Sequence, residues 1–595
     1  APMAYELWAH HMNHNPANPE WANRDRFILS GGHGSMLLYS LLHLFGYGLT
    51  KEDLMNFRQV GSLTPGHPEY GHTVGVEATT GPLGAGMGMA VGMAMAEKHL
   101  ASVFNKESYP VVDHFTYVLG GDGCMMEGIS SEAFSLAGTL GLGKLIVLYD
   151  SNRISIEGST DIAFRENVEE RMKAFGFQTI TVEDGTDIDA IGAAIEVAKA
   201  DTEHPSFITI KTEIGFGCPA KQGKASAHGE PLGVDNIKAM RETLGWQYEE
   251  PFFVPEEVYE HYSRLAEEKA DVEAAWNAMF AAYCDEYPEM EKLWEQYHTA
   301  PDAKALIENE ALWLTKDKAE ATRSLSGKMI NILKDIMPNM IGGSADLAPS
   351  NKTAMKDAGD FSAENPAGRN LHFGVRELAM TAIGNGIMLH GGLRAYVATF
   401  FVFSDYVKPM ARLSALMGVP LTFVLTHDSI GVGEDGPTHE PIEQLAMFRA
   451  MPNFHVFRPC DATETSAAWL SAVTSEKTPT ALVLSRQNLN PIPGSSKDAL
   501  KGGYVIDDCE GTPDAILIAS GSEVDLAVKA KAELTAEGKK IRVVSMPCMD
   551  LFEEQSEEYK ESVLPKEVRR RVVVEALSDF GWGKYVGLDG AYVTM

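Results

Sequence analysis

Asp122 and Asn152 are two oxygen-bearing residues that stand 30 positions apart, each beside an apolar run. Asp122 lies among glycines after the run from Phe115 to Leu119, and Asn152 ends the segment LIVLYDSN. Because the carboxyl ends of parallel strands meet at one edge of a sheet, we expect both side chains there. Hard cations such as Mg²⁺ or Ca²⁺ take such oxygens, and glycines let the backbone approach phosphate closely. A Gly-Asp-Gly hairpin is the alternative, but a helical stretch from Met125 to about Leu140 argues against it.

A second concentration of chemical groups follows the predicted strand PLTFVLT. The glycine-broken loop HDSIGVGEDGPTH holds two histidines and three carboxylates within 13 positions: His427, Asp428, Glu434, Asp435 and His439. α/β sheets bind their ligands at this end of a strand. Zinc is possible in principle, but no i, i+4 histidine pair and no cysteine partner supports it.

Glu377 is a third candidate, placed where the helical stretch from Leu378 to Leu389 begins. A carboxylate in the first turn of a helix is favourable by itself, so the residue alone does not establish a function.

Composition narrows the class of protein. The 595 residues carry 50 Lys+Arg against 83 Asp+Glu, and the net charge of -33 disfavours nucleic acid and anionic membranes as partners. No apolar run is long enough to span a bilayer, and the N-terminal segment has neither the basic start nor the apolar stretch of a signal peptide. Six scattered cysteines suggest neither a disulfide framework nor a zinc site, which fits a reducing cytoplasm.

The order of strand and helix signals predicts an α/β fold with three successive parallel-sheet domains. Strand and helix signals alternate in the first block, a charged helical segment follows, and alternation then resumes in two further blocks. The predicted segments are an α/β domain at 1–250, a helical connector at 251–319, an α/β domain at 320–489, a linker at 490–503, and a C-terminal α/β domain at 504–595. The last domain looks incomplete, since it stops at AYVTM straight after a glycine-rich stretch.

Motifs along nearly the whole chain closely resemble the transketolase family, whose members use thiamine diphosphate. They include LSGGHGSMLLYSLLHLFGY, TPGHPE, TTGPLGAG, GDGCMMEGISSEAFSLAGTLGLGKLIVLYDSNRISIEG, GGSADLAPSN, HFGVRE, HDSIGVGEDGPTHEPIEQ, FRPCD and LSRQNL, in the family's order. The family normally has a further SGHPG-type turn, with one more active-site histidine, before the point where this sequence begins.

The resemblance implies two cofactor-binding domains, one for the diphosphate and one for the aminopyrimidine. The cation, Mg²⁺ or alternatively Ca²⁺ or Mn²⁺, would be held by Asp122, Asn152 and the backbone carbonyl of Ile154. The diphosphate and thiazolium would be lined by His33, Gly81, Pro82, Leu83, Gly123, Asn152 and His228. The aminopyrimidine would be bound by Asp346, Phe400, Phe403 and Tyr406, with Phe403 as the stacking face. Without the resemblance, these aromatic residues would be interpreted as core packing.

The resemblance also assigns catalytic and substrate roles. Glu377 would exchange a proton with the aminopyrimidine ring, and His67, His228 and His439 would serve the sugar hydroxyls, as neutral-range bases suit such steps. The substrate set is Arg323, Ser350, His427, Asp435, His439 and Arg486, most of it directed at a sugar phosphate. The implied enzyme moves a two-carbon ketol unit between sugar phosphates in the pentose phosphate pathway.

Two alternatives stand beside this hypothesis. One is a formaldehyde-accepting or pyruvate-decarboxylating relative, and a pyruvate user would not need Arg323, Ser350, His427 and Arg486 together. The other is a non-catalytic homologue, for which loss of Asp122, Asn152 or Glu377 would be expected, and all three are present. The resemblance further implies a homodimer with active sites at the subunit interface.

Overall fold

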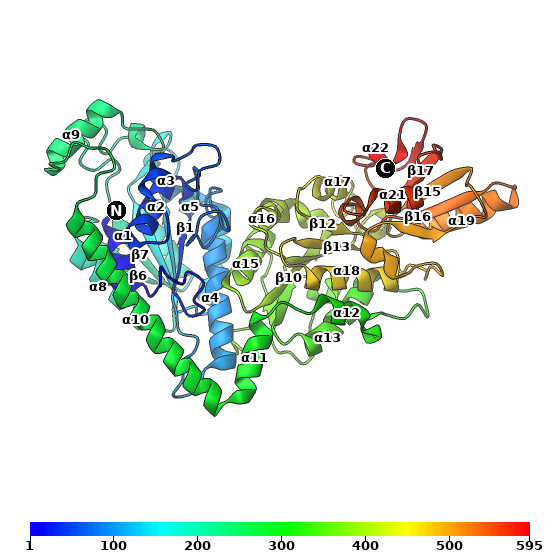
Figure 1. Cartoon of the computed structure of the whole chain (residues 1–595), viewed down its shortest axis with the longest axis horizontal. Helices are drawn as coiled ribbons and strands as arrows, with labels where there is room; N and C mark the ends of the chain where they lie inside the picture. Colours follow the sequence, from blue (N-terminus) through cyan, green and yellow to red (C-terminus); the bar gives the residue numbers. More distant parts are fainter. The chain divides into compact units, whose positions relative to one another are not determined.

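The computed structural model describes residues 1–595, which form two compact units. Unit 1 comprises Ala1–Trp294 with Ser362–Ala367, and unit 2 comprises Glu295–Phe361 with Gly368–Met595. Figure 1 shows the elements of each unit along the chain.

Unit 1 is built on a five-stranded, all-parallel sheet of order β1-β2-β3-β7-β6. Its strands are β1 (Arg26–Leu29), β2 (Thr116–Gly121), β3 (Leu145–Ser151), β7 (Ser206–Lys211) and β6 (Gln178–Val182). The central strands are apolar and almost entirely buried, as expected when helices cover both faces.

Helices pack on this sheet in two groups. The core on one face joins the strands to α1 (Pro2–Glu6), α2 (Ser35–Phe45), α8 (Ile188–Ala200) and α10 (Glu256–Glu286). The second group is α4 (Ala85–Phe104) and α6 (Gly128–Thr139), which contact each other, and α4 also contacts the strands β1, β2 and β3. The stretch predicted as one helix from Met125 to about Leu140 is two, because α5 (Asp122–Met126) ends at Glu127, whose backbone is extended.

The segment after unit 1's sheet is helical. It contains the long α10 and the shorter α11 (Pro288–His298) and α12 (Ala303–Glu308). In unit 1, α10 packs against α2.

Unit 2 holds two sheets, of which the first is six-stranded and all parallel, in the order β12-β13-β11-β10-β8-β9. Its strands are β12 (His455–Phe457), β13 (Thr480–Leu484), β11 (Thr422–Thr426), β10 (Arg394–Phe400), β8 (Met340–Ser344) and β9 (Asn370–His372). Its main helices are α13 (Thr322–Ile336), α15 (Glu377–His390), α16 (Ser404–Met417) and α18 (Ala462–Thr474), with the short α14 (Ala348–Asn351) following β8.

The second sheet of unit 2 is five-stranded, in the order β14-β16-β15-β17-β18. Its strands are β14 (Tyr504–Asp507), β16 (Ile541–Ser545), β15 (Ala515–Ala519), β17 (Arg571–Val574) and β18 (Ala591–Val593), and α19 (Glu523–Ala536) packs on it. The prediction of three successive α/β domains is confirmed, with one difference. Strand β14 pairs antiparallel with β16, since an edge strand needs no helical crossover to join an otherwise parallel sheet.

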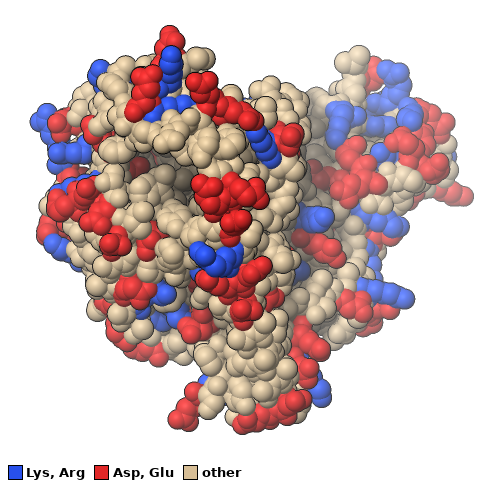
Figure 2. Space-filling view, turned by 60° about the vertical axis from the view of Figure 1, so that its left-hand side comes forward, with Lys and Arg blue, Asp and Glu red and all other residues tan.

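Charge and hydropathy agree with the composition. Acidic side chains are spread over much of the face drawn in Figure 2, with basic ones between them. No helix is both long and apolar enough to cross a bilayer. All six cysteines are free thiols.

Candidate active site

The structure brings Asp122 and Asn152 to one edge of the sheet in unit 1. Asp122 begins α5 directly after β2, and Asn152 follows β3, which pairs in parallel with β2. The Arg153 amide donates to Asp122 Oδ2 at 2.9 Å, and the Ile154 amide donates to Asn152 Oδ1 at 3.0 Å. A single turn, 152–154, therefore connects the two oxygen-bearing side chains.

Asp122 is buried, with 5% of its surface exposed. Burial raises the pKa of this carboxyl, while hydrogen bonds from the Tyr149 hydroxyl and the Arg153 amide oppose that shift. A carboxylate held in such a place is stabilised by a cation, because opposite charge favours the ionised form.

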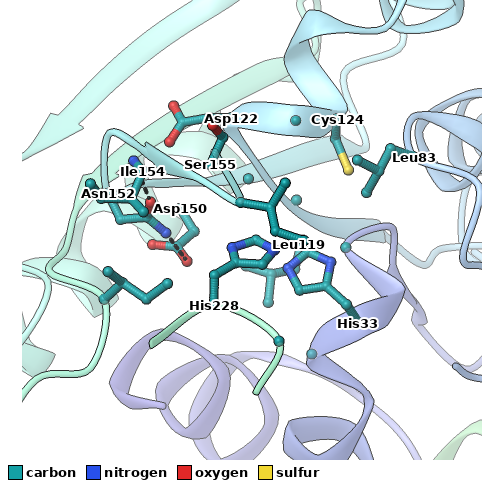
Figure 3. Close-up of a pocket in the computed structure, with 18 of the residues that line it drawn as sticks. His33, Leu83, Leu119, Asp122, Cys124, Asp150, Asn152, Ile154, Ser155 and His228 are labelled. Carbon is teal, nitrogen blue, oxygen red and sulfur yellow. Dashed lines mark hydrogen bonds between the residues drawn. The ribbon is translucent and has the colours of Figure 1, made fainter. Parts of the chain in front are cut away.

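A cavity of about 600 Å³ opens beside these residues. Gly31, Gly121, Gly123 and Gly229 are among the residues that line it, together with Ile154. Figure 3 shows the rings of His33 and His228 side by side, with Asp122 and Asn152 on other walls. The two rings are 4.7 Å apart at an interplanar angle of 29°. Burial, and then the charges of His228, His67 and Arg58, lower the pKa of His33.

The Gly81-Pro82-Leu83 turn connects the remaining predicted residues of unit 1. Gly81 has φ +136°, and a Cβ there would lie 3.3 Å from His67 Cγ. A Cβ on Gly123 would lie 2.9 Å from Leu83 Cδ1. Both positions therefore favour glycine, one for its backbone angle and one for space. Burial, and then the charge of Arg58, lower the pKa of His67.

The residues around this cavity form a half-site in unit 1, and their donor atoms fit a diphosphate bound together with a divalent cation. No three His, Cys, Asp or Glu side chains gather at one point in the structure. A cation would therefore rely on the single carboxylate of Asp122, on neutral protein oxygens, and on oxygens of the ligand. That is the ligand set Mg²⁺ takes when it binds substrate phosphates.

In unit 2, Glu377 is the first residue of α15 and is buried, with 9% of its surface exposed. The Thr399 hydroxyl donates to Glu377 Oε1 at 3.3 Å. Asp346 follows β8 and takes φ +61°, a left-handed backbone that is uncommon outside glycine.

The predicted aromatic group lies just beyond β10. The rings of Phe400 and Phe403 are stacked, 6.0 Å apart at 11°, and Tyr406 lies 6.3 Å from Phe403 with 59% of its surface exposed. His439 contacts Phe403 edge-on at 5.3 Å. The ring of His427 lies 3.8 Å from that of Phe400.

The predicted phosphate ligands also converge in unit 2. Arg323 Nη1 donates to the Ser350 carbonyl at 2.9 Å and lies 3.4 Å from His427 Nε2. Arg486 forms an ion pair with Glu434, which lies in the loop that also holds His427. Asp435 lies beside Glu434 in an exposed turn.

His427 has the most strongly altered histidine pKa of this group. Burial, then Arg323 and Arg486, and finally His439, lower its pKa to about 3. The neutral ring contacts Thr426 Oγ1 through Nδ1 at 2.7 Å, and the Thr426 hydroxyl donates to Asn351 Oδ1. Nδ1 therefore carries the proton, and Nε2 faces Arg323. The fixed positive charge of this cluster comes from the arginines.

Two residues that fix the carboxylates of Asp122 and Asp428 were not predicted from the sequence. Tyr149 donates to Asp122 from inside β3, and Arg458, directly after β12, forms an ion pair with Asp428. A polar group within or directly after an apolar strand is the only sequence feature that marks them.

The similarity of this chain to known proteins identifies its class and its family. The sequence matches the thiamine diphosphate binding domain of transketolase over residues 1–300, the transketolase pyrimidine binding domain over 318–491, and a transketolase-like C-terminal domain over 502–595. Together with the two half-sites, these matches define an α/β enzyme that uses thiamine diphosphate. The chain belongs to the transketolase family.

Its relatives match over almost the whole chain. The transketolase of Bacillus subtilis (strain 168) is 56% identical, covering 99% of this chain and 89% of the relative, and that of Geobacillus stearothermophilus is 53% identical with the same coverage. Among solved structures, a transketolase from Leishmania mexicana superposes with a TM-score of 0.96 at 45% identity, covering 100% of this chain and 88% of the other. A Pichia stipitis transketolase in complex with sedoheptulose 7-phosphate gives 0.95 at 47% identity, with the same coverage.

Proposed function

We propose that this enzyme transfers a two-carbon ketol unit from a ketose phosphate of the xylulose 5-phosphate type to an aldose phosphate, within the pentose phosphate pathway. Ribose 5-phosphate and erythrose 4-phosphate represent the acceptor type. The observation that carries the proposal is the convergence of Arg323, Ser350 and His427 in one cluster, with the charge of Arg486 acting on it. The Pichia stipitis relatives whose structures contain sedoheptulose 7-phosphate, xylulose 5-phosphate or fructose 6-phosphate support the same substrate class.

The residues of unit 1 are assigned to the diphosphate end of the cofactor. Asp122, Asn152 and the Ile154 carbonyl would hold the divalent cation, Mg²⁺ or a substitute such as Ca²⁺ or Mn²⁺. The remaining contacts to diphosphate and thiazolium would come from His33, Gly81, Pro82, Leu83, Gly123 and His228. When bound, the cofactor supplies the electron sink for carbon–carbon cleavage.

The residues of unit 2 are assigned to the aminopyrimidine end. Phe403 would stack on the ring, with Phe400, Tyr406 and Asp346 beside it. Glu377 would move a proton at the ring nitrogen, which its buried place at the start of α15 suits.

The substrate residues divide into proton carriers and a phosphate clamp. His67, His228 and His439 would exchange protons with sugar hydroxyls, and Asp435 would accept a hydroxyl hydrogen bond. The clamp consists of Arg323, Ser350, His427 and Arg486. A planar guanidinium binds phosphate through two parallel hydrogen bonds, which explains arginine rather than lysine in this role. A pyruvate-decarboxylating enzyme has no use for such a clamp, because pyruvate carries no phosphate.

We further propose a homodimer in which unit 1 of one subunit and unit 2 of the other complete each active site. Large apolar side chains are exposed beside both half-sites. Ile156 and Ile162, in the loop after Asn152, are 74% and 70% exposed, and Val375, two residues before Glu377, is 74% exposed. These exposed apolar side chains beside both half-sites support the proposed interface. The free thiols fit a cytoplasmic location.

The direct test is an assay with thiamine diphosphate, Mg²⁺, xylulose 5-phosphate and ribose 5-phosphate. Formation of sedoheptulose 7-phosphate is expected. Its absence, with the protein folded and saturated with cofactor, would overturn the proposal.

The interface model has its own test, based on two-fold symmetry. Inactive Asp122→Ala and Glu377→Ala proteins are mixed under conditions where subunits exchange. Each mixed dimer should contain one doubly damaged site and one intact site, so about a quarter of all sites should recover with random pairing. If mass spectrometry confirms exchange and no activity returns, both residues belong to one chain's site.

A further inference from the structure

Arg458 lies at the centre of a buried charge cluster that joins the two sheets of unit 2. It directly follows β12 of the first sheet and has no exposed surface. Its guanidinium contacts Asp428 Oδ2 through Nε at 2.9 Å and through Nη2 at 2.8 Å. From the C-terminal domain it contacts Glu523, the first residue of α19, and, at 3.8 Å, Glu575, which follows β17.

Backbone and hydroxyl groups complete the setting of Arg458. Nη1 donates to the Ser520 carbonyl at 2.9 Å, and Nη2 donates to Ser522 Oγ at 3.1 Å. Between them, Gly521 has φ +55°, and a Cβ there would lie 2.8 Å from Arg458 Cγ. The 520–522 turn therefore closes around this arginine and leaves no room for a larger residue than glycine.

One acidic partner, Glu575, is itself held by residues from both domains of unit 2. Glu575 follows β17 and accepts two hydrogen bonds from Arg449, at 2.8 and 3.0 Å, and one from Trp582 Nε1 at 2.6 Å. Burial alone would raise the pKa of Glu575, but Arg449 and Arg458 hold it below its ordinary value. The carboxylate is thus charged, and it stabilises the positive charge that Arg458 retains despite burial.

Asp428 connects this charge cluster to the phosphate clamp, because it directly follows His427 in the chain. The preceding residue, His427, has φ +64°, a conformation that costs energy for a residue other than glycine. Neighbouring contacts must hold that backbone. On one side of it, His427 Nδ1 bonds Thr426 Oγ1 at 2.7 Å, and on the other Arg458 holds the Asp428 carboxylate. Removing the charge pair would free the backbone on one side of His427.

We propose that Arg458 is a positioning residue for the phosphate clamp, and that the C-terminal domain acts on substrate binding through Glu523 and Glu575. The inference rests on the proposed function, since it needs His427 to contact a sugar phosphate. It implies that the C-terminal domain influences which substrate binds, although that domain supplies none of the predicted site residues.

The test compares two donors in the full-length enzyme with cofactor bound. Arg458→Met should raise KM for xylulose 5-phosphate about 10-fold or more, while KM for hydroxypyruvate, which has no phosphate, stays within about 2-fold. Asp428→Asn, which keeps the shape and removes the charge, should shift KM in the same direction by a smaller factor. Arg458→Lys should recover part of the loss, because it restores charge without the planar fork.

The matched control is Arg542→Met. Arg542 lies on β16 and forms a two-bond pair with Asp508 at 2.9 and 2.9 Å, in the C-terminal domain that also holds Glu523 and Glu575, but without a contact to the 427–443 loop. It should leave both KM values unchanged. Circular dichroism and melting temperature check folding, and if Arg458→Met does not fold, Asp428→Asn and Glu523→Gln carry the comparison.

A double-mutant cycle separates positioning from general support. If Arg458 acts through His427, adding Arg458→Met to His427→Ala should change KM for the phosphorylated donor by less than about 2-fold. Independent, multiplicative losses would overturn the proposal, as would equal losses on both donors. Wild-type enzyme with no preference for phosphorylated over unphosphorylated donors would instead overturn the proposed function itself.

Discussion

The two half-sites are built in opposite ways. In unit 1, backbone and glycine positions shape the cavity, and one short turn joins Asp122 to Asn152. In unit 2, the site consists of long side chains delivered by separate elements, such as Arg323 from α13 and His427 from the loop after β11. A site of the first kind is encoded locally, whereas one of the second kind depends on how distant elements pack.

Their charges differ as well. The unit 1 half-site offers a buried carboxylate, which suits a cation. The clamp in unit 2 offers two arginines beside a neutral histidine, which suits an anion. In a chain with a net charge of -33, the clamp is thus a local group of positive charge.

The largest expected effect follows from removing the single carboxylate of unit 1. Asp122→Ala should reduce activity to background, because the cation loses its only charged protein ligand. Titration calorimetry should show Mg²⁺ and thiamine diphosphate affinities falling together. Asp161→Ala, an exposed acid in the same region, is the control. Unchanged cofactor affinity in Asp122→Ala would contradict the assignment.

Glu377→Gln tests the other half-site and should separate binding from turnover. The amide keeps the shape and the contact with Thr399 but cannot exchange a proton. We expect near-normal cofactor affinity with kcat lower by about 10²–10⁴-fold, the usual range for a general acid–base step. Glu476→Gln, on the surface of unit 2, serves as control. Wild-type turnover would leave Glu377 as a helix-start charge only.

The contrast between the half-sites also explains what could be predicted from sequence. Strand–helix alternation fixes a parallel sheet, so the shared edge for Asp122 and Asn152 followed from spacing and is what the structure has. The antiparallel edge strand β14 did not follow, because a short strand gives no signal of direction.

The clamp in unit 2 was reached only through family resemblance. Arg323 and Arg486 stand more than 100 positions apart in the chain, and no local period relates them. Arg458 was not singled out at all, since a buried arginine is paired by tertiary contacts that a single sequence does not reveal.

The arginines of the clamp predict an effect of intermediate size. Arg323→Ala or Arg486→Ala should raise KM for xylulose 5-phosphate by about 10- to 100-fold, as a charge-assisted contact contributes about 1.5–3 kcal/mol. KM for hydroxypyruvate should change little. Arg412→Ala, an exposed arginine on α16, is the matched control. Equal losses on both donors would assign the arginines a structural role.

The smallest expected effect compares two histidines whose pKa values are both lowered to about 3, His14 in unit 1 and His427 in unit 2. His14 is fully buried, where its ring nitrogens bond the Tyr47 hydroxyl at 2.9 Å and the Trp8 carbonyl at 3.3 Å. Burial is the main cause of its shift. We assign His14 to stability and His427 to substrate binding.

The sign of the pH effect follows from the lowered pKa. The unfolded chain protonates His14 below its ordinary pKa of about 6.5 and the folded chain does not, so stability is lost as pH falls from there toward 3. Between pH 7.5 and pH 5 this amounts to on the order of 2 kcal/mol. His14→Phe should therefore lose less unfolding free energy over that interval than wild type, measured by urea unfolding. Glu97 and Glu464, whose raised pKa values act in the opposite direction, are common to both proteins and cancel in the difference. An identical pH dependence in the two proteins would show that His14 is not held neutral. A donor-specific KM change in His14→Phe would contradict the assignment of His14 to stability and of His427 alone to substrate binding.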